Sequence, residues 1–156
     1  MATTLKLTGY LAAEAEITFS GTQTLNSLAD NEYTNWSDEI DNSTNLYEAV
    51  DLRVVLASAA FATPADCGLE IYLIPTVNGT NYPTWTGDTA TDQVHNGAFF
   101  VGYVPLTGTS AAQAGVLREV YLPNGKYRWA VRNRGNVTLA GSGNTVFWRP
   151  HSHQSV

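Results

Sequence analysis

Few residues of this chain have the type and spacing that chemistry requires. His151 and His153 lie two positions apart, so in a strand they would share a face and could offer two ligands to a metal ion. A catalytic zinc site needs three protein ligands, and the sequence supplies no third partner near this pair. We therefore expect no metal there. His95 lies in a polar stretch, and we expect it to be solvated.

Acidic side chains gather in one short segment, which raises the question of calcium. Starting from Asp41, the sixth position of an EF-hand loop would be Leu46 where glycine is needed, and the twelfth would be Leu52 where glutamate is needed. An irregular calcium site stays open, but a solvated acidic surface is the favoured interpretation. The cluster consists of Asp30, Glu32, Asp38, Glu39 and Asp41.

Hydrolase and dinucleotide motifs are missing. The chain has no G-x-S-x-G elbow, and no serine, histidine and aspartate have a spacing that suggests a triad. The GSG at 141–143 lacks the third glycine of a dinucleotide loop, and strand-like residues follow it. Cys67 has no nearby histidine or lysine in the sequence, so a small buried thiol or an inert one is expected. We predict neither an enzyme nor a bound cofactor.

Basic side chains at even positions form a candidate contact surface. The odd positions between them, Tyr127, Trp129 and Val131, are apolar. At the two-residue period of a strand, one face would enter the core and the other would form a basic stripe. The stripe consists of Lys126, Arg128, Arg132 and Arg134. We expect its three arginines to belong to a docking or inter-subunit surface.

Aromatic residues in a polar loop form a second candidate. Tyr82 and Trp85 lie in the stretch 81–96, and together with Trp36 they could stack against a sugar. Loop aromatics also cover the ends of sandwiches or anchor interfaces. Both interpretations stay open, with glycan binding the less favoured.

Short strands separated by turns account for the rest of the chain. The stretch 119–134 predicts two strands joined as a hairpin by an Asn-Gly turn. Further strands are expected at 48–56 and 69–74, as antiparallel neighbours, at 98–104, buried on both faces, and at 144–150, with a short one near 33–36. The pattern predicts an all-β, antiparallel, jelly-roll-like β-sandwich of about eight to ten short strands. It would form a single domain over 1–156, with an N-terminal arm (1–10) and a C-terminal tail (150–156).

Composition narrows the setting. The 156 residues are 44% hydrophobic, which is enough to form a core without disulfides or structural metals. The single cysteine excludes an internal disulfide. The start has no secretory pattern and no segment approaches a membrane span, so we expect folding in the cytoplasm. A net charge of −6 disfavours nucleic acid.

Charge is distributed unevenly along the chain. Residues 1–75 carry eleven acidic and two basic side chains, whereas 76–156 carry three acidic and six basic ones. Acidic strands beside basic ones in the same sheet would explain this distribution, and that is the favoured interpretation. Self-association, with the acidic part of one copy meeting the basic part of another, is the alternative.

Several segments resemble a known group of proteins when taken in order. They are IDNSTNLY at 40–47, EIYLIP at 70–75, an Asn-Gly-x-Asn-Tyr pattern at 78–82, LPNGKY at 122–127 followed by Arg132-Asn133, and SGNT at 142–145. Over about residues 25–148 the chain is similar to small virion proteins of tailed bacteriophages. No functional residue is carried over from that group, because none of these positions has a known role in it.

The resemblance implies a non-enzymatic structural protein of the phage particle. The first expectation is a capsid decoration (cement) protein that binds the outside of the assembled head and stabilises it. Its partners would be the major capsid protein and sister copies in a homo-oligomer such as a trimer, with no nucleic acid and no membrane. The alternatives are a tail or collar accessory and a glycan-binding adaptor.

Overall fold

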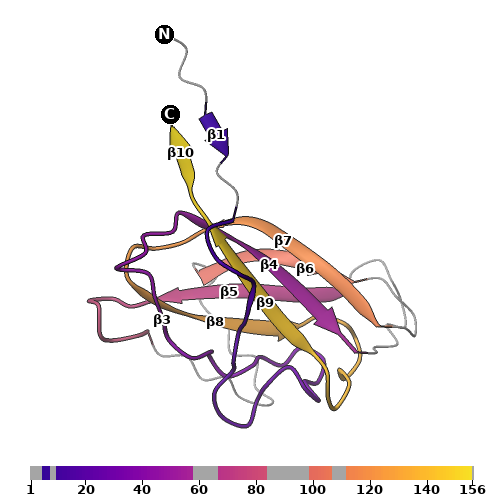
Figure 1. Ribbon diagram of the computed structural model, residues 1–156. Coiled ribbons are helices and arrows are strands. Elements are labelled where there is room, and N and C mark those ends of the chain that lie inside the picture. Colours follow the sequence, from indigo (N-terminus) through magenta and orange to yellow (C-terminus); the bar gives the residue numbers. More distant parts are fainter. Residues whose placement is uncertain (1–4, 8–9, 58–66, 84–98, 107–111, 156) are drawn as a thin grey trace.

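The computed structural model describes residues 5–7, 10–57, 67–83, 99–106 and 112–155 (Figure 1). Predictions about Trp85, His95 and the turn at 63–66 lie outside these residues. The described residues form strands and no helix, so the all-β prediction is confirmed. The strands are β1 (Leu5–Leu7), β2 (Ala15–Glu16), β3 (Ile40–Asp41), β4 (Ala49–Leu56), β5 (Gly68–Pro75), β6 (Phe100–Pro105), β7 (Gln113–Tyr121), β8 (Lys126–Asn133), β9 (Thr145–His151) and β10 (His153–Ser155).

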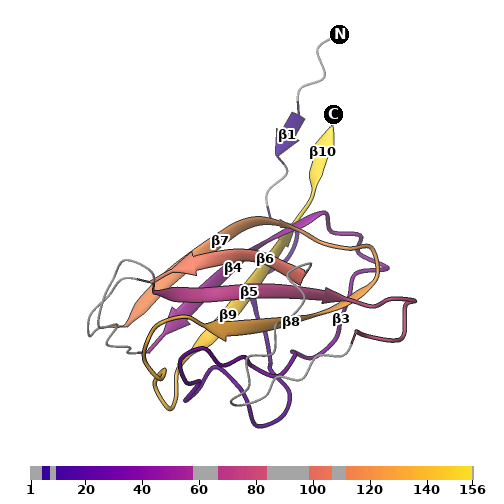
Figure 2. The same cartoon turned by 180° about the vertical axis from the view of Figure 1, so that it is seen from behind.

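Eight of the strands form two antiparallel sheets that face each other as a sandwich (Figures 1 and 2). One four-stranded sheet has the order β2-β9-β4-β7, and the other has the order β3-β8-β5-β6. The predicted antiparallel β-sandwich is thereby confirmed, while its jelly-roll connectivity stays a prediction. We call the first the β4 sheet and the second the β8 sheet.

Alternation in the two central strands builds the core. Val50, Leu52 and Val54 of β4 point inward and are fully buried, as the period-two pattern predicts. Tyr127 and Trp129 of β8 meet them from the other sheet and are also fully buried. Each such aliphatic side chain contributes about 1.5–3 kcal/mol to stability on burial.

The predicted hairpin at 119–134 is wrong. β7 ends at Tyr121 in the β4 sheet, and β8 begins at Lys126 in the β8 sheet, so residues 122–125 form a corner between sheets. Gly125 has a φ of 132°, which meets the expected need for glycine. An Asn-Gly turn can join two strands of one sheet or two strands of different sheets. The residues of the turn therefore could not distinguish a hairpin from a connection between sheets.

Two other strand predictions are also wrong. β4 and β5 are not neighbours but belong to opposite sheets, because the chain crosses the sandwich between them. β6 is the last strand of its sheet rather than one buried on both faces, and Phe100 is 45% exposed. The strand is apolar because one face packs on β7, where the Leu117 side chain fills the space beside Gly102.

The expected short strand near 33–36 is instead a pair of isolated bridges, Phe19 to Ser37 and Tyr33 to Arg132. This segment runs along β8, but side chains replace part of the ladder. The Val131 N–H donates to Thr34 Oγ1 at 3.0 Å, and the Trp129 N–H donates to Ser37 Oγ at 2.9 Å. Thr34 and Ser37 are both buried, so their hydroxyl oxygens satisfy two backbone N–H groups of β8 that water does not reach.

The predicted C-terminal tail is structured. β9 continues through Pro150 to His151, and β10 then pairs with β1 in antiparallel register, Leu5 opposite Ser155 and Leu7 opposite His153. The two chain ends thus form a two-stranded ribbon that extends away from the sandwich (Figures 1 and 2). The predicted N-terminal arm therefore contains a strand, and its partner is the other end of the chain.

Asn42 holds the corner between the sheets, which generates a first prediction. Its Nδ2 donates to the carbonyl oxygens of Tyr47 at 2.9 Å and Pro123 at 3.0 Å, and its Oδ1 accepts the Tyr47 N–H at 2.8 Å. The side chain is buried, so Asn42→Ala would leave these groups unsatisfied and lower the free energy of unfolding by about 2–4 kcal/mol in urea titrations. The exposed Asn45 of the same loop is the matched control. An equal effect of Asn45→Ala would contradict this role for Asn42.

Candidate functional site

The basic stripe lies on the outer face of the β8 sheet, and its parity is as predicted. The face is not open to solvent, however, because loop residues cover it. Ala130 and Ile74 on this face are fully buried, and Tyr33 lies over them with only 6% of its surface exposed. Trp36 and Tyr82 pack against the same cluster. The sandwich therefore has a second, outer apolar layer on this side.

Arg128 lies at the centre of this outer layer. Its guanidinium is 4.9 Å from the centroid of the Trp36 ring and 4.7 Å from that of Tyr82, and the two rings are 5.6 Å apart. The Nε atom of Arg128 is buried and has no hydrogen-bond partner among the described residues. Cation–π attraction strengthens when the cation is desolvated, so this group stabilises the layer rather than presenting a free charge.

Glu39 joins this cluster to Lys126, the first residue of β8. It accepts a hydrogen bond from the Tyr82 hydroxyl at 3.0 Å and pairs with Lys126 Nζ at 2.7 Å. The hydrogen bond from Lys126 holds the pKa of Glu39 below its ordinary value. Burial raises the pKa of the Tyr82 hydroxyl. Two of the basic and aromatic residues chosen from the sequence, Lys126 and Tyr82, thus share one carboxylate.

Arg132 and Arg134 share a second carboxylate, Glu70. Register places Glu70 directly opposite Arg132, and the charged atoms lie 3.4 Å apart; Arg134 Nε lies 3.7 Å from the same residue. The Arg132 guanidinium also lies 5.0 Å from the centroid of Tyr33, and Arg134 donates to Asn31 Oδ1 at 2.7 Å. Pairing of acidic with basic strands inside one sheet is confirmed here. Self-association through charge stays a prediction.

The three arginines thus lie on one face but in different surroundings. Arg128 lies over two rings, and the side chain of Arg132 is 20% exposed. Arg134 has 44% of its side chain exposed and is the one most accessible to a partner. Parity in the sequence identified their common face, but it carried no information about the loops that cover that face.

Tyr82 is the described half of the expected aromatic pair, since Trp85 lies outside the described residues. Its ring contacts Trp36 and Arg128, and its hydroxyl is bound by Glu39. This arrangement fits the interpretation of loop aromatics as a cover over the sheet. Glycan binding by Tyr82 stays a prediction.

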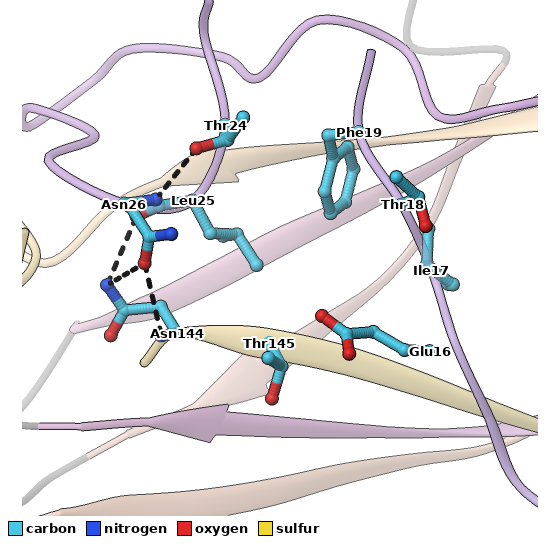
Figure 3. A pocket seen from close by; sticks show the side chains of 9 residues that line it. All are labelled: Glu16, Ile17, Thr18, Phe19, Thr24, Leu25, Asn26, Asn144 and Thr145. Atoms are coloured by element: carbon cyan, nitrogen blue, oxygen red, sulfur yellow. Dashed lines mark hydrogen bonds between the residues drawn. The ribbon is translucent and has the colours of Figure 1, made fainter. Parts of the chain in front are cut away.

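A pocket of about 170 Å³ opens beside the start of β9 (Figure 3). Asn144 and Asn26 form one wall, and their polar groups bind each other: the Asn144 N–H and Nδ2 both donate to Asn26 Oδ1 at 3.2 Å. Asn144 Nδ2 also donates to the Ala140 carbonyl at 2.6 Å, and its Oδ1 accepts the Ala57 N–H. These amides hold three loops together. The pocket is lined by Glu16, Ile17, Thr18, Phe19, Thr24, Leu25, Asn26, Asn144 and Thr145.

A second pocket, of about 180 Å³, is lined by Asp30, Asn31, Arg134 and Asn136. Its polar atoms are likewise paired with one another. Asp30 accepts from Asn31 Nδ2 at 2.7 Å and from the Asn136 N–H at 2.9 Å. The arrangement ties the 30–31 turn to the loop that follows β8.

Metal-binding side chains do not converge in the described residues: no group of three or more histidine, cysteine or acidic side chains lies together there. The acidic cluster is dispersed, with Glu32 accepting from Gln23, Glu39 paired with Lys126, and Asp41 capping the Ser43 N–H. His151 faces Asp51, its Nε2 3.5 Å from Oδ1. The Cys67 thiol is buried, as expected, and donates to the Gly135 carbonyl.

Asp51 is a polar centre that the sequence did not reveal. It lies on the outer face of β4 and accepts the Tyr10 hydroxyl at 2.8 Å and the Glu119 N–H at 2.9 Å. The Glu119 N–H is available because β7 bulges there, so that Arg118 and Glu119 both stand opposite Asp51. Alternation marked Asp51 as outward-facing, but its partners come from both chain ends and β7, which no local pattern connects.

The hydrogen bonds to Asp51 shift its titration. Burial raises the pKa of this carboxyl, but the hydrogen bonds from the Glu119 N–H and the Tyr10 hydroxyl outweigh that effect. The positive charges nearby act in the same direction, and together they hold the pKa below its ordinary value. Asp51 therefore anchors the segment at Tyr10, the bulge of β7 and the end of β9 in its charged form.

Comparison with known proteins adds no identification. No protein-family model matches the chain, and no curated protein or solved structure matches it either. The resemblance to phage virion proteins stays a prediction. In the described parts of the chain, no helix is long and apolar enough to cross a bilayer.

The lowered pKa of Asp51 predicts a loss of stability in acid. A carboxyl whose pKa is depressed by folding stabilises the protein above its unfolded-state pKa, about 4, and that contribution disappears as the pH falls through the folded value. Asp51→Asn should therefore lower the free energy of unfolding at pH 7, and the gap from the wild type should shrink by pH 3. Urea titrations at both pH values measure it. Tyr10→Phe removes one donor and should give a smaller gap; a gap that does not shrink in acid would contradict this role.

Arg128 generates a stability prediction that compares it with Arg134 of the same stripe. Arg128→Ala removes a partly buried cation that lies over two neighbouring rings and should lower the free energy of unfolding by about 1–3 kcal/mol, including lost packing of its stem. Arg134→Ala removes a half-exposed side chain and should cost about 0–1 kcal/mol. Thermal or urea unfolding of the two variants side by side tests the difference. Equal losses would mean that the contact of Arg128 with the two rings contributes nothing to stability.

Proposed function

We propose that this protein is a structural component of a bacteriophage particle, and specifically a capsid decoration protein that binds the outer surface of the assembled head. The motifs from 40–47 to 142–145 support this proposal, because their order and spacing together resemble small virion proteins of tailed phages. A sandwich whose polar pocket groups are bound to one another is consistent with a protein that works by contact.

The observation that carries the proposal furthest is the terminal ribbon. β1 and β10 pair with each other and extend beyond both sheets (Figure 1). A ribbon of two strands is marginally stable in water, because it has too few neighbours to bury its surface. Docking onto another protein would supply that burial. The ribbon is therefore our proposed shell-binding element, extending the expected arm at 1–10 to include the other chain end.

Binding of this kind stabilises the shell without chemistry. A protein that binds only the assembled head favours assembly by mass action, and many copies that each bridge shell subunits act together. The proposed partners are the major capsid protein and sister copies. Arg134 can join the docking surface because it is exposed, whereas Arg128 and Arg132 contribute by holding the outer layer in place.

The test is to mix the purified protein with phage heads that lack it and to count bound copies by cryo-electron microscopy. Many copies at regular positions on the shell are expected. Proline fixes φ and lacks an N–H, which disfavours strand pairing, so Lys6→Pro should lower occupancy about tenfold at sub-saturating protein, whereas Lys6→Ala should bind as the wild type does. Equal occupancy for both variants would contradict docking by the ribbon.

Other outcomes of the same experiment point to the alternatives. A few copies confined to one vertex or to the tail would support a tail or collar accessory. Screening on glycan arrays would follow, with Tyr82→Ala as the variant that tests a sugar-binding adaptor. No bound copies on heads or tails would overturn the virion proposal.

A further inference from the structure

β7 is the last described strand of the β4 sheet, and no described strand pairs with its outer edge. Among the described strands, only β4 pairs with β7, and it does so along one side (Figure 1). Two apolar side chains near this edge are open to solvent: Val116 is 47% exposed and Tyr121 is 79% exposed. Exposed tyrosines are frequent anchors of protein interfaces. This edge is thus distinct from the ribbon and from the covered face of the β8 sheet.

The segment Val116 to Tyr121, VLREVY, is symmetric in its chemistry about its midpoint. The register with β4 sets the faces: Val116 lies opposite Arg53 and Tyr121 opposite Ala49, on the outer face. Leu117 and Val120 lie opposite the core residues Leu52 and Val50, on the inner face. The two central residues, Arg118 and Glu119, have opposite charges. At each distance from the midpoint, the two residues either share a face and are both apolar or carry opposite charges.

The bulge at the midpoint restricts which strand can add to this edge. Glu119 has a φ of 55°, and its N–H turns to Asp51. A regular strand cannot follow an edge that is interrupted in this way, which is how bulges protect sheet edges from indiscriminate pairing. A second copy carries the same bulge, and in antiparallel pairing about the midpoint the two bulges coincide. Both charges are accessible, since Glu119 is exposed and the Arg118 side chain is 71% exposed, with its guanidinium 3.7 Å from the Asp51 carboxylate.

We propose that two copies of this chain pair through β7, antiparallel, about a two-fold axis that passes between Arg118 and Glu119. Arg118 then faces the partner's Glu119, and Val116 faces the partner's Tyr121 on the outer surface. Both pairs occur twice because the contact is isologous. Opposite charges and an aromatic ring beside a β-branched residue are favourable cross-strand pairs. The contact joins two β4 sheets into one and does not depend on binding to a shell.

This contact predicts a dimer rather than the trimer expected from the resemblance, because a self-complementary edge is used up once two copies have paired. Sedimentation velocity over a range of concentrations should show a monomer–dimer equilibrium for the full chain. Arg118→Glu brings like charges together twice at the axis, so its dissociation constant should rise about tenfold or more. The double variant Arg118→Glu, Glu119→Arg restores opposite charges and should restore the dimer.

Two further variants keep the test independent of folding. Tyr121→Lys changes a side chain that is 79% exposed and should also weaken the dimer, whereas Val77→Lys, at a position 75% exposed and outside β7, should leave it unchanged. Circular dichroism and urea unfolding identify any variant that fails to fold. A wild-type monomer at all concentrations, a trimer, or a charge swap that fails to restore a dimer lost in Arg118→Glu would overturn the proposal.

Discussion

The structure depends on β8 being covered on both faces. Its inner side chains, with Trp129 at the centre, fill the space between the sheets, and its outer side chains lie beneath an aromatic layer. The segment along its edge supplies hydroxyls of Thr34 and Ser37 where a strand would supply carbonyls. A long polar connection is thereby held against the sheet. Without the apolar rings above it, Ala130 and Ile74 on the outer face would lose their cover.

Charge is balanced within the molecule more than its distribution along the chain suggests. The carboxylates of Glu39 and Glu70 come from the acidic half, and they pair with the basic residues of β8. Such pairs are individually weak when exposed, but the Arg132 side chain is only 20% exposed and its guanidinium also lies 5.0 Å from the centroid of the Tyr33 ring. Apart from the exposed Arg134, the surfaces that we propose for partners are the terminal ribbon and the edge of β7.

Both of those surfaces arise from how the sandwich ends. The chain ends leave the sheets together and, among the described strands, pair with each other, and β7 is the last described strand of its sheet and is interrupted by a bulge. The Asp51 carboxylate connects the two regions, since it binds Tyr10 near the ribbon and Glu119 in the bulge. A single side chain thus connects Tyr10, which is close in the chain to the proposed docking ribbon, with the backbone of the proposed dimer edge.

The sequence by itself determined the fold class, the main strands β4, β5, β8 and β9, and which side chains of β4 and β8 face the core, because period-two alternation is a local property of each strand. It identified the shared face of Arg128 and Arg132 and the need for glycine at Gly125. Only the tertiary structure decided that the turn at 122–125 joins different sheets, that β6 is an edge, that loops cover the arginine face, and that the two chain ends pair. Each of these is a choice of partner between segments far apart in the chain, and residue type constrains a strand's own faces but not which strand lies beside it.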